Sequence, residues 1–294
     1  MRITKLTCTA LSLLIMFTVV SCTSENEEWE NLLDEQLSKW EIYQSYKLTD
    51  DYNGQQPKDE EGNPVEPIGY NKNVGDVFTV SLAYNEPILR ISGEIYGCVF
   101  TKKEFENYHL SMKVKWGNKK WEPRLDKLKD SGLLYHSIGE CGKDYWRSWM
   151  LSQEYQIMEG HMGDHWGFSN TAIDIRAFIP EGIMNAVAGE GQPFLPVGAG
   201  TGLDGFCLRN ADYESPEGEW TTLELICFDD KSIRIVNGHV VMILRNSRYV
   251  SDGESTPLTK GKIQLQSEAA EVFFKDIRIK SISAIPDEYS EYFD

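Results

Sequence analysis

Hydrophobic and polar residues alternate with a period of two along much of this 294-residue chain. Residues 108–116 show the pattern clearly, because every second residue is hydrophobic or aromatic and those between are polar or basic. Side chains of a β-strand point alternately to its two faces, so this period predicts a strand with one face against a core. Similar patterns predict strands at residues 77–84, 87–92, 95–100, 174–181, 221–228, 232–238, 239–244, 261–268 and 271–282.

Two further predicted strands, residues 133–137 and 153–158, lie in the segment 130–166, which concentrates three of the five histidines. In the second strand, Glu154 and Gln156 share the face opposite to an aromatic and an aliphatic residue. A carboxylate beside a carboxamide is how a sugar-binding cleft is lined. Glu159 has the wrong parity for this face, and we expect a β-bulge near Gly160 to turn it towards the other two.

The strands are short and are separated by turns, with no long helical period and no internal repeat. Asn237-Gly238 between two alternating runs is a strong hairpin signal. Residues 182–206 are rich in glycine and proline and predict a long loop. We therefore expect an all-β chain, a sandwich or a barrel, with one large domain over residues 29–284 and an acidic tail at 285–294. In such a sandwich a bent sheet would offer its concave polar face as a carbohydrate cleft.

The net charge of the chain limits which classes of molecule it can bind. The formal net charge is −17, which argues against nucleic acid and against electrostatic docking to an anionic membrane. Hydrophobic residues make up 41% of the chain and aromatic residues 12%, which is enough for a substantial core.

Residues 1–21 have the pattern of an export signal, with a basic start and a short apolar run at 11–20. That run is too short to span a bilayer comfortably. It ends in Val-Val-Ser-Cys, which resembles a bacterial lipobox and makes Cys22 the expected lipidated residue. Residues 22–28 form an acidic tether like the surface-export signals of Bacteroidetes lipoproteins. We expect an outer-membrane lipoprotein, the alternatives being a plain secretory signal and a simple polar tether.

Four other cysteines follow the signal: Cys98, Cys141, Cys207 and Cys227. Their spacing contains no CxxC pattern, which argues against a zinc site. Cys227 lies in an apolar run and is expected to be a buried free thiol. An exported protein can form disulfides, but the sequence leaves the pairing of these cysteines open.

A series of motifs in order resembles the 3-keto-disaccharide hydrolase domain family, over nearly all of residues 29–282. The matching stretches are Lys115-Trp116-Gly117, residues 120–124 (KWEPR), 130–136 (DSGLLYH), 154–160 (EYQIMEG), Gly163-Asp164, Glu219-Trp220, Asn237-Gly238, 261–267 (GKIQLQS) and 274–279 (FKDIRI). The resemblance implies a concanavalin-like jelly roll. It also implies chemistry on sugars already oxidised to a ketone at C3, which an oxidoreductase partner would have to supply.

A ketone at C3 makes the hydrogen on C2 acidic, so a base can remove it and the resulting enolate expels the group on C1. Such an enzyme needs a base, an acid and a positive group near the C3 oxygen. Glu154 and His136 are the candidates for base and acid, in either order. Many family members have Arg where this chain has His136, and a histidine, unlike an arginine, can move protons. The plainer alternative for His136 is a hydrogen-bonded strand residue.

Other polar residues are candidates for substrate binding. Gln156 suits sugar hydroxyls, Gln266 and Glu268 would close the cleft, and Arg124 and Lys115 could hold the enolate oxygen or simply pair with surface acids. Trp116, Trp121, Trp146 and Trp149 could stack on a sugar, although packing is the commoner use of any one tryptophan.

A divalent metal is a further alternative. Glu159, His161, Asp164 and His165 form a tight cluster of ligand types, in which His161, Asp164 and His165 are the main candidates. A bound ion would act as a Lewis acid for the C3 ketone. Their spacing matches no known metal motif, so a polar loop without metal is the simpler interpretation.

Two competing functions stay open. Glu154-x-Gln156-x-x-Glu159 is similar in spacing to the E-x-D-x-x-E strand of laminarinase-type retaining glycosidases, with Gln in place of the central Asp. Glu154 and Glu159 would then be nucleophile and acid–base, about 5–5.5 Å apart. The third alternative is a non-catalytic carbohydrate-binding lipoprotein on the same fold.

Overall fold

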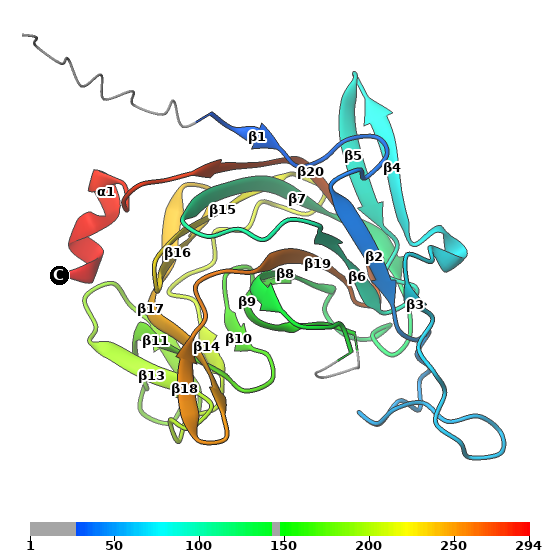
Figure 1. Ribbon diagram of the computed structural model, residues 1–294, viewed down its shortest axis with the longest axis horizontal. Helices are drawn as coiled ribbons and strands as arrows, with labels where there is room; N and C mark the ends of the chain where they lie inside the picture. Colours follow the sequence, from blue (N-terminus) through cyan, green and yellow to red (C-terminus); the bar gives the residue numbers. More distant parts are fainter. Residues whose placement is uncertain (1–27, 143–147) are drawn as a thin grey trace, which may run out of the picture.

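A computed structural model describes residues 28–142 and 148–294. These residues form two curved, mainly antiparallel sheets packed face to face, with short turns between most strands (Figure 1). Across the first sheet the order is β4 (Phe78–Ala83), β5 (Glu86–Ile91), β20 (Ala270–Ser281), β7 (Tyr108–Lys120), β15 (Thr221–Phe228), β16 (Lys231–Val236), β17 (His239–Ser251), β11 (Thr171–Phe178) and β13 (Phe194–Gly198). Two short strands, β1 (Glu30–Asn31) and β18 (Glu254–Pro257), pair with β20 and β17.

The second sheet carries the candidate site. Its order is β3 (Gly69–Tyr70), β2 (Trp40–Gln44), β6 (Gly97–Thr101), β19 (Lys262–Ser267), β8 (Asp130–Ile138), β9 (Leu151–Met158), β10 (His165–Gly167), β14 (Phe206–Leu208) and β12 (Ala186–Ala188). Strand β12 also pairs with β11, which joins the two sheets at one edge.

The main hydrophobic core lies between the sheets. It combines every second residue of β7, β15 and β20 with every second residue of β8, β9 and β19, such as Leu110, Phe274, Tyr155 and Leu265. Hydrophobic burial at this interface is the main driving force for the arrangement. The second sheet therefore turns its other residues, including Glu154 and Gln156, away from the core.

The all-β jelly-roll sandwich expected from the sequence is confirmed. The hairpin at Asn237-Gly238 is also confirmed, since Val236 pairs with His239 and both turn residues have positive φ. The loop predicted at 182–206 is wrong, because this segment contributes β12 and β13 and begins β14. The acidic tail includes a short helix, α1 (Asp287–Ser290), and a 3-10 turn at residues 291–293. Ile285, Tyr289 and Phe293 of this tail pack against β15 and β16 in the middle of the first sheet, on its outer face.

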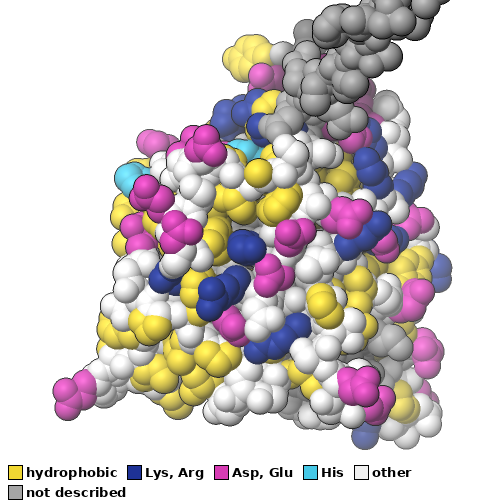
Figure 2. All heavy atoms as spheres, turned by 60° about the vertical axis from the view of Figure 1, so that its left-hand side comes forward, with side chains coloured by type: hydrophobic (Ala, Val, Ile, Leu, Met, Phe, Trp, Pro, Cys, Tyr) yellow, Lys and Arg dark blue, Asp and Glu magenta, His cyan; other side chains and the backbone are white. Residues whose placement is uncertain are grey.

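The export signal at 1–21, Cys22 and most of the 22–28 tether lie outside the described residues, so their predictions stay predictions. Among the residues that the structure describes, no helix has the length and hydrophobicity needed to cross a bilayer. On the face shown in Figure 2, basic side chains lie scattered among acidic and hydrophobic ones, without one extended basic patch.

Candidate functional site

The polar face of the second sheet forms the floor of a cavity of about 580 Å³. Strands β19, β8 and β9 lie side by side here, and their registers align three rows of residues. From β19 to β9 the rows are Glu268–Asp130–Met158, Gln266–Gly132–Gln156 and Gln264–Leu134–Glu154. Because alternate residues share a face, three carboxylates and three carboxamides gather from strands far apart in the sequence.

Arg124 links two of the three carboxylates. Its Nη2 lies 2.5 Å from Asp130 Oδ2 and 2.7 Å from Glu268 Oε1. Gln156 Nε2 donates a hydrogen bond of 3.0 Å to the other oxygen of Asp130. Burial raises the pKa values of Asp130 and Glu268, and the contact with Arg124 opposes this rise. The group is therefore an array of acceptors held by one partly buried cation.

Glu154 is the carboxylate without such a partner. The residue is 3% exposed, and its carboxyl makes no hydrogen bond or ion pair within the described chain. Burial raises the pKa of Glu154 well above its usual range, and the nearby charges of Glu268 and Asp130 raise it further. The surroundings of Glu154 thus favour the protonated form of its carboxyl, and no contact with Arg124 opposes this as directly as it does for Asp130 and Glu268.

Gly132 leaves the space that these side chains need. A Cβ at Gly132 would lie 2.1 Å from Glu154 Oε1 and 2.3 Å from Gln266 Oε1, so any side chain here would force both of these groups to move. The Glu154 carboxyl and the Gln266 carboxamide therefore lean towards each other over this glycine. Neither polar atom of Gln266 has a hydrogen-bond partner among the described residues, so its oxygen can accept a hydrogen bond from a protonated Glu154.

Aromatic and aliphatic side chains form the walls of the cavity. Trp149, Phe168, Trp166 and Met158 line it, and Trp166 pairs with Glu154 across β10 and β9. Trp166 is 43% exposed, a large aromatic surface at the rim of a polar floor. Apolar walls around a few convergent polar groups are typical of a small-molecule site, and aromatic faces suit the C–H face of a sugar ring.

The structure does not bring His136 and Glu154 together. Alternation along β8 predicted His136 on the cavity face, but a bulge between Tyr135 and Ile138 rotates it, with His136 at φ 51°. The ring packs against Tyr108 and Tyr135, between the sheets. Burial lowers the pKa of His136 to about 4, and neither ring nitrogen has a side-chain partner in the described chain.

Two other expectations for site residues are corrected. Glu159 lies beyond the end of β9 and outside the cavity. The expected bulge is absent, since β9 pairs in regular register with β8 up to Met158. The Glu159 carboxylate instead accepts a hydrogen bond from the backbone N–H of Lys129. Lys115 lies on the first sheet, with its ammonium over the rings of Trp220 and Phe273.

Trp116 packs in the core between the sheets, and Trp121 packs beside Tyr96 and Trp149 in a second cluster. Trp146 lies outside the described residues.

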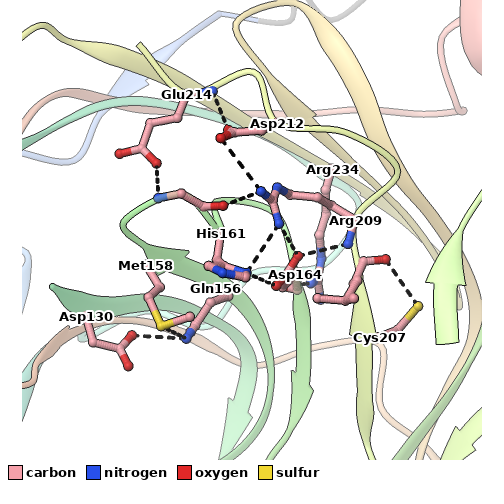
Figure 3. A network of polar contacts seen from close by, with 12 residues as sticks. Asp130, Gln156, Met158, His161, Asp164, Cys207, Arg209, Asp212, Glu214 and Arg234 are labelled. Carbon is pink, nitrogen blue, oxygen red and sulfur yellow. Dashed lines mark hydrogen bonds and ion pairs between the residues drawn. The ribbon is translucent and has the colours of Figure 1, made fainter. Parts of the chain in front are cut away.

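Two of the candidate metal ligands, His161 and Asp164, instead belong to a network of polar contacts with Arg209 (Figure 3). Asp164 accepts hydrogen bonds from the Nη1 and the backbone N–H of Arg209, at 3.0 and 2.8 Å, and lies 3.0 Å from Nδ1 of His161. His165 turns its Nδ1 to the buried Arg234, at 3.0 Å, and burial lowers its pKa well below the usual range. Guanidinium groups already supply the positive charge, and no set of three metal-ligating side chains occurs in the described parts of the chain.

The sequence patterns missed some of the residues that the fold places in the cavity. Asp130 begins the alternating run that includes Gly132 and Leu134. This alternation could have predicted that Asp130 lies on the cavity face. Trp166 and Phe168 follow a turn, where alternation gives no guide. Lys127 also lines the cavity. The sequence of the basic loop at 117–129 did not indicate which of its basic residues would lie there.

The family model described as a 3-keto-alpha-glucoside-1,2-lyase-like domain matches residues 28–280. A search of curated proteins gives no match.

Solved structures with a similar arrangement are distant in sequence. A protein of Parabacteroides distasonis provisionally called a glycosyl hydrolase is 17% identical, with a TM-score of 0.46, covering 87% of this chain and 100% of its own. A second such protein from the same organism is 14% identical, with a TM-score of 0.46, covering 87% of this chain and 95% of its own. The LamAcat structure from Zobellia galactanivorans is 11% identical, with a TM-score of 0.41, covering 83% and 91% of the two chains.

Proposed function

This chain belongs to the family of 3-keto-alpha-glucoside-1,2-lyase-like domains, and from that membership we propose that it is a carbohydrate-active enzyme that cleaves 3-keto-glycosides. The substrate is a glycoside or disaccharide whose C3 hydroxyl has been oxidised to a ketone. The reaction is elimination between C1 and C2, with hydration of the unsaturated product as a following step. An oxidoreductase acting on C3 must supply the substrate.

Glu154 is the proton-transfer group of this reaction. Its carboxylate removes the hydrogen from C2, and the electron pair passes into an enolate on the C3 oxygen. When the ketone re-forms, a double bond joins C1 and C2 and the bond from C1 to the leaving oxygen breaks. The same carboxyl, now protonated, can return the proton to the leaving oxygen, because C1 and C2 are adjacent. His136, buried between the sheets, takes no part in this step.

The raised pKa of Glu154 supports this role. A carboxylate of ordinary pKa, about 4.3, is a weak base for a C–H bond, and general-base efficiency rises with the proton affinity of the base. Burial and two neighbouring carboxylates increase that affinity in Glu154. The protonated state that burial favours is also the one needed to protonate the leaving oxygen.

The remaining polar groups bind and orient the sugar. Asp130 and Glu268, fixed by Arg124, offer acceptors for ring hydroxyls, and Gln156 offers an amide. The charge of Arg124 is already shared by two carboxylates, so we assign charge stabilisation of the enolate oxygen to Lys127. Lys127 lines the cavity and has no ion pair within the described chain. The tryptophans and Phe168 provide the apolar surface for the ring.

One observation carries the proposal: a buried carboxylate, free of partners among the described residues, at the floor of a tryptophan-walled cavity. The retaining-glycosidase alternative loses support because Glu159 points away from that cavity. Its salt bridge and hydrogen bond are with Lys129.

Turnover of matched substrates tests the proposal. The purified protein is incubated with an aryl glucoside and with its 3-keto form, and release of the aryl group is measured. Cleavage of the keto sugar alone is expected, and Glu154→Gln should reduce its kcat/KM by about 10²–10⁴-fold. Cleavage of the plain glucoside would favour ordinary glycoside hydrolysis. Binding of either sugar without turnover would contradict the enzymatic proposal.

Export is a separate proposal that rests on sequence. We infer from the lipobox that the chain is lipidated at Cys22 and anchored in the outer membrane.

A further inference from the structure

Two buried thiols lie close together on the cavity side of the second sheet. The Sγ atoms of Cys98 and Cys141 are 3.9 Å apart, although the residues are 43 positions apart in the chain. Cys98 is fixed on β6, between its neighbours on β2 and β19. Cys141 lies in the turn that follows β8, where its backbone N–H donates to the hydroxyl of Tyr70. Non-bonded sulfur atoms so placed need only small side-chain rotations to reach bonding distance, about 2.05 Å.

The other two thiols in the described chain have different surroundings. Cys207 contacts the carbonyl of Leu208, and Cys227 is fully enclosed in the core between the sheets. Among the described residues, neither of them contacts the sulfur of another cysteine, so Cys98 and Cys141 are the pair that the fold has brought together.

We propose that Cys98 and Cys141 are a disulfide-forming site, oxidised by thiol–disulfide exchange with a donor disulfide. The Cys141 thiolate attacks one sulfur of the donor, forms a mixed disulfide and releases a thiolate. Cys98, after losing its proton, attacks the sulfur of Cys141 and releases the second thiolate. The protein loses two protons and two electrons, and the donor is reduced to two thiols.

The order of attack follows from exposure. Cys98 is fully buried, and this burial raises the pKa of its thiol, whereas Cys141 is 9% exposed. A donor disulfide therefore meets Cys141 first, and Cys98 acts as the resolving thiol inside the protein.

The bond would restrain one wall of the cavity. Cys141 begins the segment that leads to Trp149, and Cys98 Sγ also lies 4.0 Å from the carbonyl of Ser148. Trp149 lines the cavity and donates to the carbonyl of Gly97, next to Cys98. A covalent link at this place ties the turn after β8 to β6, beside the Gly97 carbonyl that Trp149 contacts.

Peptide mapping of the full-length protein tests the proposal. The reduced protein is incubated with oxidised glutathione, quenched with acid, alkylated and digested with trypsin. Peptide 91–102 should appear cross-linked to peptide 130–143, with a mass about 2 Da below the sum of the two. The melting temperature of the oxidised protein should exceed that of the reduced protein by about 5–15 °C.

Matched variants separate this pair from the remaining cysteines. Cys98→Ser and Cys141→Ser should each abolish the cross-link and the difference in melting temperature, while Cys207→Ser and Cys227→Ser should keep both. Free thiols at both positions in the folded, donor-treated protein would overturn the proposal. A stable glutathione adduct on Cys141, or a cross-link to Cys207 or Cys227, would overturn it equally.

Discussion

At the scale of single residues, the cavity is defined by which carboxylates have partners. Asp130 and Glu268 share Arg124, whereas Glu154 has only the Gln266 carboxamide leaning towards it. Burying an ionised carboxylate without a partner is costly, and the usual outcome is protonation. The protein keeps this costly buried carboxyl at a position where it can transfer a proton, as is expected of a functional site.

The Glu154 carboxyl should reduce stability at high pH. Its pKa is raised in the folded state, so its favourable contribution is complete below the unfolded value of about 4.3 and is lost as pH rises towards the folded value. Glu154→Gln should therefore be more stable than the natural protein at pH 8, by on the order of 1–3 kcal/mol. Urea unfolding at pH 8 and pH 4.5 measures this, and the gain should shrink at the lower pH. An equal gain at both pH values would mean that the carboxyl titrates normally.

The same pKa predicts the shape of the activity profile. Because the base must be ionised, kcat/KM for a 3-keto-glucoside should rise with pH and level off only above the raised pKa of Glu154. The acidic limb should thus lie well above the usual glutamate value of about 4.3. A limb at that usual value would remove Glu154 from the role of base.

Gly132 offers a substitution that separates activity from folding. The added Cβ of Gly132→Ala meets only the ends of two flexible side chains, Glu154 and Gln266, so the fold should survive while both are displaced. A displacement of about 1 Å can cost about 10²-fold in rate, and we expect kcat/KM to fall by 10–10²-fold. Gly191→Ala is the control, because nothing lies within 4 Å of its added Cβ. Full activity of Gly132→Ala would show that the position of Glu154 does not matter.

At the scale of elements, one bulge in β8 decides which residues reach the cavity. Up to Tyr135 the strand follows strict alternation, with Asp130, Gly132 and Leu134 on the cavity face. The bulge then turns His136 into the space between the sheets. An extra residue in a strand changes the face of all that follow, so sequence parity fails after it.

His136 should therefore be dispensable for catalysis. Asparagine tolerates positive φ, so His136→Asn keeps the backbone while it removes the ring. Stability should fall, because a buried ring is lost, but kcat/KM measured below the melting temperature should stay within about 3-fold. Loss of activity comparable with that of Glu154→Gln would restore His136 as the acid or base.

At the scale of the whole molecule, two curved sheets bury one face each and leave one polar face for a ligand (Figure 1). The charge of −17 does not prevent this, because most carboxylates are spread over the surface and only three gather in the cavity.

The expected lipid anchor would place that cavity at a membrane surface. When expressed in a lipoprotein-processing bacterium, the chain should incorporate labelled palmitate, and Cys22→Ser should not. Label retained in Cys22→Ser would place the lipid elsewhere.

The sequence alone determined the long strands and most of their faces, but not the short strands of residues 165–208. Alternation in 108–116, 153–158 and 261–268 was enough to predict strands, a sandwich or a barrel, and the shared face of Glu154 and Gln156, since period-two burial is a local property. The motifs in order also identified the family, because they span nearly the whole chain.

Only the tertiary structure decided which polar residues meet. Arg124, Asp130 and Glu268 come from three separate parts of the chain, and their contacts depend on the register of β19 against β8. The inward turn of His136 and the outward position of Glu159 depend on where a bulge falls, which alternation does not encode. Local pattern fixes the face of a strand, whereas register and bulges, set by packing across the whole sandwich, fix the neighbours of each side chain.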